Sequence, residues 1–227
     1  MNILAIDTSS KFISLVIARD GNILVRFFEP LGRELSAKLV PVIDSSLKKA
    51  KLSLANIDYF GAGLGPGSFT ALRIGLAAMK GLVFPFNKPI AGISSLDVLA
   101  SSVKEEGIVC PVVDARRGLV YSAIYEANAL RRGRYLLVTI EELLKRIKIK
   151  KKITFLGDAL PLYQGIIRDK LGKRCEFAKE DLWYPLPENL LERVREKIRQ
   201  GKLTDSYKLA PIYLYPKECQ IGSIARK

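Results

Sequence analysis

The sequence predicts an α/β fold of two lobes, each with a mixed sheet flanked by helices. Two observations predict it. Residues 1–100 read as three short strands followed by helices that alternate with strands, and the second half repeats this order in reduced form. Strands joined by short turns pair antiparallel, whereas strands joined through a helix pair parallel, so this order gives sheets of both kinds. A chain of 227 residues is long enough for two such cores.

The elements of the first half follow from its apolar periodicity. Short apolar runs separated by turns such as Asp20-Gly21-Asn22 indicate strands, and apolar residues spaced three or four apart from Leu35 to Ala50 indicate an amphipathic helix. The expected strands are 3–6, 12–18, 23–28, 59–64 and 90–93, and the expected helices are 34–51, 69–84 and one that begins at Ser94 or Ser95.

The second half has fewer and shorter expected elements. The expected strands are 108–113, 119–125, 135–138 and 152–156. One expected helix begins at Thr139, and two others span 161–171 and 187–200. We therefore expect an N-terminal lobe at 1–100 and a smaller, basic second lobe at 101–205. We expect the tail, 206–227, to return to the first lobe.

The composition excludes several kinds of chemistry. The chain has no histidine, so Ser–His–Asp and Cys–His catalysis and histidine-based metal sites are excluded within one chain. Cys110, Cys175 and Cys219 are widely spaced and form no metal-binding pattern. We expect no metal and no cofactor. The start of the sequence has no signal-peptide pattern and no apolar run long enough to span a bilayer, so we expect a cytoplasmic protein.

Positive charge is concentrated in the second half. The net charge is +14, with 11 Lys/Arg and 7 Asp/Glu in residues 1–100 against 26 and 16 in residues 101–227. Residues 145–152 hold six cations in eight positions, a pattern that can contact RNA phosphates. Because no aromatic residues are interleaved for base stacking, a solvated helix end is the more favoured interpretation.

A glycine-rich turn precedes the second helix. Its residues are Gly65, Pro66, Gly67, Ser68, Phe69 and Thr70. Glycines allow backbone conformations and close approaches that other residues do not, and Ser68 or Thr70 can cap the helix that follows. Such a helix start can hold an anion or serve as a rigid structural junction, and the turn alone leaves both open.

The helix at 69–84 is apolar around its circumference, with only Arg73 and Lys80 charged between Ala71 and Val83. Such a helix is buried on more than one side. Either it is a core helix of one subunit, or it packs on its own lobe and on a partner. The second interpretation predicts partner contacts at Ala71, Leu72, Arg73, Gly75, Met79 and Leu82, with Arg73 facing an acidic group.

Carboxylates are the remaining candidates for catalysis. Asp7, Asp97 and Asp114 stand at strand ends or helix starts, and Asp7 has the best position. Asp7, Thr8 and Ser9 are candidates for a nucleotide site, functional or vestigial. The favoured alternative is a turn in which Asp7 bonds the backbone of the residues that follow.

Four motifs carry a resemblance to a known family. They are Ile6-Asp7-Thr8-Ser9-Ser10, the stretch from Gly65 to Gly75, Lys88-Pro89-Ile90-Ala91-Gly92-Ile93-Ser94-Ser95-Leu96, and Asp114 to Tyr121. Their order and spacing resemble the TsaB (YeaZ) family, and the element order resembles that of the actin-like ATPase (ASKHA, ribonuclease H-like) fold. This resemblance implies a mixed five-stranded sheet in each lobe. Leu209 to Leu214 resembles the tail of that family. Ala71 stands where the family usually has glycine.

The resemblance implies a non-catalytic subunit in the formation of threonylcarbamoyladenosine next to the tRNA anticodon. It implies a heterodimer with the transferase TsaD, joint action with the ATPase TsaE, and docking through the helices at 34–51 and 69–84. The two metal-binding histidines of the transferase family fall on Ser95 and Leu99 of this chain, so we expect no enzyme activity. A free subunit is expected to pair with itself through the same face.

Two alternatives come from other classes. One is an actin-like phosphotransferase that uses Asp7 and the glycine-rich turn to bind ATP. The other is an RNA-binding module that docks tRNA through residues 145–152. A glycoprotease activity is discounted, because the chain has no nucleophile paired with a base.

Overall fold

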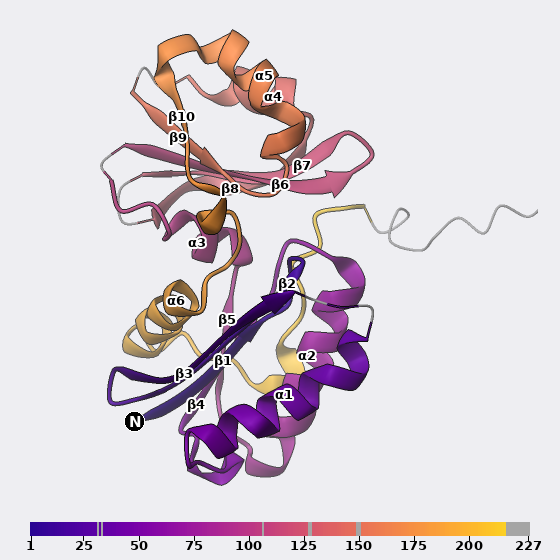
Figure 1. The fold of residues 1–227 in the computed structure, drawn as a ribbon, viewed down its shortest axis with the longest axis vertical. Coiled ribbons are helices and arrows are strands. Elements are labelled where there is room, and N and C mark those ends of the chain that lie inside the picture. Colours follow the sequence, from indigo (N-terminus) through magenta and orange to yellow (C-terminus); the bar gives the residue numbers. More distant parts are fainter. Residues whose placement is uncertain (31, 33, 106, 127–128, 149–150, 217–227) are drawn as a thin grey trace, which may run out of the picture.

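The protein folds into two lobes stacked along its long axis (Figure 1). The computed structural model describes residues 1–30, 32, 34–105, 107–126, 129–148 and 151–216. Cys219, Lys150 of the basic run and residues 217–227 of the tail therefore lie outside the described residues.

The first lobe is built on a sheet with the strand order β3-β2-β1-β4-β5. β1 pairs antiparallel with β2 and parallel with β4, and β4 pairs parallel with β5. The strands are β1 (Asn2–Asp7), β2 (Phe12–Arg19), β3 (Asn22–Pro30), β4 (Tyr59–Gly63) and β5 (Ile90–Ile93). The short turn between β1 and β2 and the helical connections to β4 and β5 produce this mixed pairing, as the sequence predicted.

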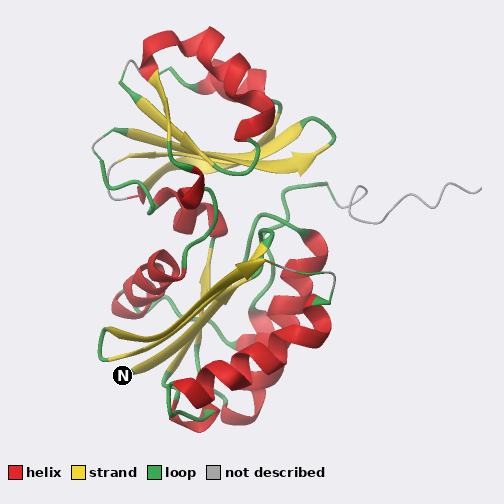
Figure 2. Cartoon of the chain, in the orientation of Figure 1, coloured by secondary structure: helices red, strands yellow, loops and turns green. Residues whose placement is uncertain are grey.

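Helices cover both faces of the first sheet (Figure 2). Leu4 and Ile6 of β1 pack toward α1 (Leu35–Lys49) and α2 (Phe69–Val83), whereas Ile3 and Ala5 pack toward α6 (Pro187–Arg199). Alternate residues of a strand point to opposite faces, so a strand that is buried on both faces is apolar along its length. Short 3₁₀ turns η1 (Leu54–Asn56) and η2 (Phe84–Phe86) follow the two helices.

The second lobe repeats the strand arrangement, with the order β10-β9-β6-β7-β8. Its central strand, β6, pairs antiparallel with β7 and parallel with β9. Its elements are β6 (Ile108–Arg116), β7 (Leu119–Glu126), β8 (Leu130–Val138), α4 (Ile140–Arg146), β9 (Ile153–Leu156), α5 (Leu160–Leu171), η4 (Gly172–Arg174), β10 (Cys175–Phe177) and η5 (Glu180–Leu182). α4 and α5 lie on one face, and α3 (Ser95–Ala100) lies on the other (Figure 1).

The last long helix differs from its expected place. The sequence order assigned it to the second lobe at 101–205, but α6 packs on β1, β2 and β5 of the first lobe. Leu190, Leu191 and Val194 lie in one cluster with Ile3 and Ala5, because the apolar stripe of α6 covers the face of the first sheet that α1 and α2 leave open. The sequence also missed β10 and the first residues of β8. The lobe boundaries themselves stay a prediction.

The tail contacts both lobes. Leu209, just after η6 (Ser206–Lys208), is buried in the first-lobe core, and the Ile212 N–H donates to the Leu64 carbonyl at 2.8 Å. The Tyr215 hydroxyl then donates to the Ala115 carbonyl of the second lobe at 2.9 Å. The segment from Leu209 to Tyr215 therefore returns to the first lobe and continues onto the second.

The expectation that no segment could span a bilayer was wrong on length and composition. Among the described residues, Phe69–Phe86 is an 18-residue helical stretch with a mean hydropathy of 1.4. Core helices of globular proteins have the same properties. In this fold α2 packs against β4, β1 and α1, with Leu76, Met79 and Val83 in the first-lobe core.

Candidate functional site

The glycine-rich turn forms a junction between three segments of the first lobe. The Ser68 N–H donates to the Ser9 carbonyl at 2.8 Å, and the Ser95 N–H donates to the Gly65 carbonyl at 2.9 Å. Gly65 has a φ of +80°, which favours glycine, and a Cβ at Gly67 would collide with the Ser9 backbone. The end of β1 and the start of α3 therefore hold the turn in place. This arrangement fits a rigid structural junction.

The other residues of the motif begin α2 and reach its surface. Ser68 is the residue before the helix, and its side chain makes no capping hydrogen bond. Phe69 packs against Tyr213 of the tail with the two rings tilted and their centroids 5.2 Å apart, and the Arg73 guanidinium lies 3.8 Å from the Phe69 ring centre. The motif thus positions α2 and provides an aromatic contact for the tail.

Asp7 ends β1 and is 1% exposed. Its Oδ1 accepts from the Ser9 N–H at 2.7 Å, and its Oδ2 accepts from the Ser95 hydroxyl at 2.6 Å. Burial raises the pKa of Asp7, and the hydrogen bonds oppose that rise. A Cβ at Gly63 would collide with the carboxylate, so the backbone of β4 closes the site from the other side.

Thr8 and Ser9 are equally enclosed. They are 2% and 5% exposed, and the Thr8 hydroxyl donates to the Ala71 carbonyl in the first turn of α2 at 2.8 Å. A Cβ at Gly75 would collide with Thr8 Oγ1, so the absence of a side chain at Gly75 lets α2 lie against β1. The predicted nucleotide residues Asp7, Thr8 and Ser9 come together, but within a packed junction between β1, β4, α2 and α3.

The positions of the two transferase histidines are also internal. Ser95 is 1% exposed and links Asp7 to the turn, since its hydroxyl also accepts from the Gly65 N–H at 3.1 Å. Leu99 is 2% exposed and packs in the core of the second lobe. In the described part of the chain, no three His, Cys, Asp or Glu side chains are grouped so that they could hold a metal ion.

The other two candidate carboxylates face the second lobe. Asp97 accepts hydrogen bonds from the Tyr125 hydroxyl at 2.7 Å and from the Tyr135 hydroxyl at 3.0 Å, so it links α3 to β7 and β8. Burial and the Asp97 charge raise the pKa of Tyr135 to about 12. Asp114 lies near the end of β6 and forms an ion pair with Arg116 at 3.1 Å.

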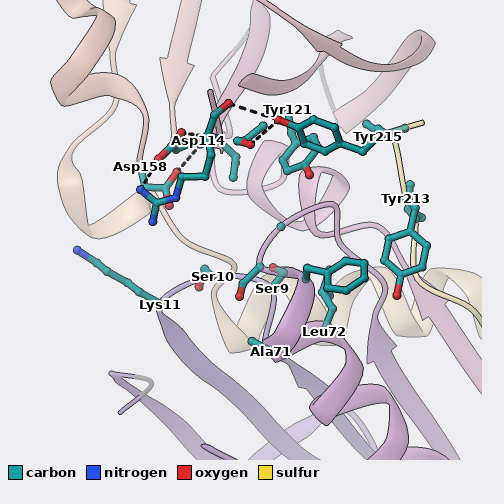
Figure 3. A pocket seen from close by; sticks show the side chains of 18 residues that line it. Ser9, Ser10, Lys11, Ala71, Leu72, Asp114, Tyr121, Asp158, Tyr213 and Tyr215 are labelled. Atoms are coloured by element: carbon teal, nitrogen blue, oxygen red, sulfur yellow. Dashed lines mark hydrogen bonds and ion pairs between the residues drawn. The ribbon is translucent and has the colours of Figure 1, made fainter. Parts of the chain in front are cut away.

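A cavity of about 660 Å³ separates the two lobes beside Asp114. Figure 3 shows Ser9, Ser10 and Lys11 on its first-lobe side and Asp114, Asp158 and Tyr121 on its second-lobe side. The Asp114 N–H donates to Asp158 Oδ1 at 2.9 Å, and burial raises the pKa of Asp158. Asp7 and Thr8 do not line this cavity. The positive charges of Lys11 and Arg116 in its lining are balanced by the carboxylates of Asp114 and Asp158.

Most of the predicted partner contacts lie inside the subunit. Ala71, Leu72 and Met79 are at most 7% exposed, and Gly75 is buried against Thr8. Arg73 is exposed, and its Nε donates to the Tyr213 hydroxyl at 3.0 Å, while Leu82 is half-buried. Ala71 and Met79 lie in the first-lobe core with residues of the sheet and α1, and Leu72 lies beside Gly65. The four buried residues therefore make contacts within the subunit, as the core-helix interpretation predicts. Partner contact through the set stays a prediction.

Apart from Arg73, the residues of α2 that face outward were not in the predicted contact set, although Ala77, Ala78 and Gly81 were recognisable as small residues that allow close approach of another helix. Thr70, Ala77 and Gly81 are exposed, as is Phe84 just after the helix, and Ile74 and Ala78 are half-buried. A Cβ at Gly81 would meet nothing within 4 Å. The small residues were visible in the sequence, but a helix that is apolar all round does not reveal which side faces its own sheet.

An apolar groove continues this face between α1 and the end of α2. It has a volume of about 610 Å³. Its apolar lining residues are Val40, Ile43, Leu47, Leu52, Leu54, Leu82 and Phe86. Val40 of this lining is 45% exposed, and Phe84, which follows α2 and packs against Tyr207, is 59% exposed. The groove and the outward side of α2 thus present apolar side chains on the outside of the first lobe, beside the ion pair between Lys48 and Asp44 of α1.

Comparison with known proteins identifies the family. A model of the TsaD family, described as tRNA N6-adenosine threonylcarbamoyltransferase, matches residues 29–220. The tRNA threonylcarbamoyladenosine biosynthesis protein TsaB of Escherichia coli is 30% identical over 223 residues, which cover 94% of each chain. The chain belongs to the TsaB family. The resemblance of its four motifs to this family is therefore confirmed.

Solved structures confirm the fold class. YeaZ from Pseudomonas aeruginosa superposes with a TM-score of 0.79 at 23% identity, covering 94% of this chain and 99% of that one. An activator of 2-hydroxyisocaproyl-CoA dehydratase from Clostridium difficile, solved with bound ADPNP, gives a TM-score of 0.51 at 11% identity, covering 90% and 99%. The TsaB family thus shares its two-lobed architecture with a nucleotide-binding protein.

Proposed function

We propose that the chain is a non-catalytic partner subunit in tRNA threonylcarbamoyladenosine formation, which binds and activates a TsaD-like transferase. The enclosure of Asp7 by Ser95, Ser9 and the backbone of β4 carries this proposal, because it removes the carboxylate at the end of β1 from solvent and from any ligand. The relative named TsaB in Escherichia coli supports the pathway.

The outward face of α2 and the groove beside α1 form the proposed docking surface. Small residues at Ala77 and Gly81 allow close approach of a partner helix, and Val40 and Phe84 add exposed apolar area. Ile74 and Leu82, both half-buried, lie at its edge. In the absence of the transferase, this surface would pair with a second copy of the chain, because a large apolar face is unfavourable in water.

Co-elution with a TsaD-like transferase tests the docking surface. Gly75→Leu is unsuitable, because a side chain there collides with Thr8 inside the lobe. Gly81→Leu places a side chain in open space on α2, and we expect it to remain folded and to abolish co-elution. Gly165→Leu on α5, also in open space, is the matched control and should co-elute like the wild type. Co-elution of both variants would contradict the proposed surface.

We further propose that a TsaE-like ATPase acts with this complex and that the protein works in the cytoplasm, where tRNA is modified. The alternative of an actin-like phosphotransferase has less support, because Asp7 does not reach the interlobe cavity. Calorimetry with Mg-ATP and the isolated chain tests it, and we expect no binding that depends on Asp7.

A further inference from the structure

The topology of the second lobe brings three basic segments to one end of its sheet. β6, β9 and β10 are parallel and start at the same end. β8 also starts there, because it is antiparallel to β7, which is antiparallel to β6. The register aligns Arg131 with Tyr125, and Tyr125 with Val109 at the start of β6. α4 and α5 each return to this end before β9 and β10 begin.

The segments that meet at this end are strongly basic. Their described residues, 131–134, 145–148, 151–152 and 168–174, together contain 12 Lys or Arg and one Asp. The cations described as exposed are Arg131, Arg132, Arg134, Lys145, Arg146, Lys148, Lys151, Lys152, Arg168, Lys170 and Lys173. We call them the basic end. Two of them form ion pairs, Arg132 with Glu126 at 3.3 Å and Lys152 with Glu176.

Helix electrostatics explain only part of this arrangement. Lys145 and Arg146 lie in the last turn of α4, and Arg168 and Lys170 lie in the last turn of α5, where cations stabilise a helix. Arg131 and Arg134 lie on the edge strand β8 and have no such role. Neither they nor Lys145 form an ion pair with a described carboxylate within 4.0 Å.

The opposite end of the same sheet has no such excess of cations among its described residues, since Glu141, Glu142, Glu180 and Asp181 also lie there. There Arg116 pairs with Asp114, and Lys11 lies across the cavity from Asp158. Two arginines at the basic end are also supported by aromatic rings, since Arg131 lies 3.8 Å from the centre of Tyr135 and Arg168 lies 5.5 Å from that of Phe177. The excess positive charge is therefore local to the basic end.

We propose that the basic end binds the phosphate backbone of a folded RNA. Guanidinium and ammonium groups spread over an edge strand and two helix ends suit a row of phosphates more than a single anion. The identification of that RNA as tRNA rests on the proposed function. The surface lies on the second lobe, whereas the proposed transferase docking surface lies on α1 and α2 of the first, so both partners can bind together (Figure 1).

Binding of a labelled, unmodified tRNA transcript to the full chain tests this proposal. Arg131→Gln with Arg134→Gln, and Lys145→Gln with Lys148→Gln, each remove two cations of the basic end. Arg199→Gln with Lys202→Gln removes two exposed cations at the end of α6 and is the matched control. We expect each basic-end pair to weaken binding on the order of tenfold and to lower the slope of log K against log salt by about 2.

Equal weakening by the control pair would contradict the proposal, because it would show attraction to net charge alone. Absence of tRNA binding by the wild type at low salt would also contradict it. Tighter binding to phosphatidylglycerol vesicles than to tRNA, lost in the same variants, would assign the basic end to a membrane surface instead. Co-elution of each variant with the transferase, measured in parallel, separates a failure here from a failure of the proposed function.

Discussion

The central strands of the two sheets lead to very different sites. β1 and β6 occupy equivalent places in the strand orders β3-β2-β1-β4-β5 and β8-β7-β6-β9-β10. β1 ends at Asp7, which is 1% exposed and bonded to Ser95 and Ser9. β6 carries Asp114, whose carboxylate is accessible and lines the interlobe cavity. The same topology thus supports a closed structural junction in one lobe and an open surface in the other.

The outer surfaces of the two lobes also differ. The first lobe presents an apolar face on α1 and α2 with small residues at Ala77 and Gly81, and the second presents the basic end. A closed junction needs exact backbone fit, whereas an open surface tolerates change. The following substitutions test that difference, from the largest expected effect on stability to the smallest.

Gly63→Val is expected to have the largest effect. The new side chain would collide with the Asp7 carboxylate and disturb its hydrogen bonds. We expect the free energy of unfolding to fall by about 4 kcal/mol, because overpacking adds to the loss of hydrogen bonds to a buried group. Urea unfolding measures it. Gly165→Ala, in open space on α5, is the control and should raise stability by roughly 0.5–1 kcal/mol. If Gly63→Val lowers the free energy of unfolding by less than about 1 kcal/mol, the junction can accommodate the added side chain and is not rigid.

Met79→Ala tests whether α2 is a core helix of this subunit. Met79 is fully buried against the first sheet and α1, so its truncation should lower the free energy of unfolding by about 3 kcal/mol. Leu82→Ala, at the half-buried edge of the same helix, should lower it by about 1 kcal/mol. Equal effects in the isolated chain would contradict the assignment of these two sides of α2.

The raised pKa of Asp7 predicts that the stability of the fold depends on pH, with an effect smaller than that of Met79→Ala. Burial raises this pKa above 3.8, so between that value and the raised pKa the folded state binds more protons than the unfolded state. Stability contributed by this group is therefore highest below pH 3.8 and falls as the pH rises through the folded pKa. Asp7→Asn removes this dependence. Thermal unfolding of both proteins from pH 3.5 to pH 7 should show the wild type losing stability relative to the variant, and a constant difference would refute the prediction.

Tyr215→Phe should have the smallest effect. It removes the hydrogen bond to the Ala115 carbonyl at 2.9 Å but keeps the ring beside Tyr121. We expect a loss of about 1 kcal/mol or less, because one partly buried hydrogen bond contributes little net stability. Faster hydrogen exchange in residues 209–216, with none in β1, would confirm that this tyrosine holds the tail across the lobes. Unchanged exchange would assign that role to Leu209 and Ile212.

Much of this fold was predictable from periodicity alone. The two lobes, the mixed sheets and the positions of α1, α2 and α5 followed from apolar spacing and turns. The placement of α6 did not, because an amphipathic stripe reveals that a helix is covered but not by which sheet. β10 is three residues long and has no alternation to detect.

The candidate site was predictable only in part. Residues 7–9, 65–70 and 95 were singled out from sequence, and the structure brings most of them into one junction. The contacts that decide its character are steric, such as Gly63 against Asp7 and Gly75 against Thr8. These pairs are far apart in the sequence, so no local pattern encodes them, and the sequence alone did not reveal that Ala71, Leu72, Gly75 and Met79 are buried within their own lobe.

Reconstitution of threonylcarbamoyladenosine formation on a tRNA transcript tests the central claim most directly. The reaction contains a TsaD-like transferase and a TsaE-like ATPase, with this chain added as wild type, as folded Asp7→Asn or omitted. If the chain is a docking subunit whose first-lobe junction is structural, formation requires the chain and proceeds at the wild-type rate with Asp7→Asn. Loss of product with a folded Asp7→Asn that still co-elutes with the transferase would contradict the claim and assign Asp7 to the chemistry.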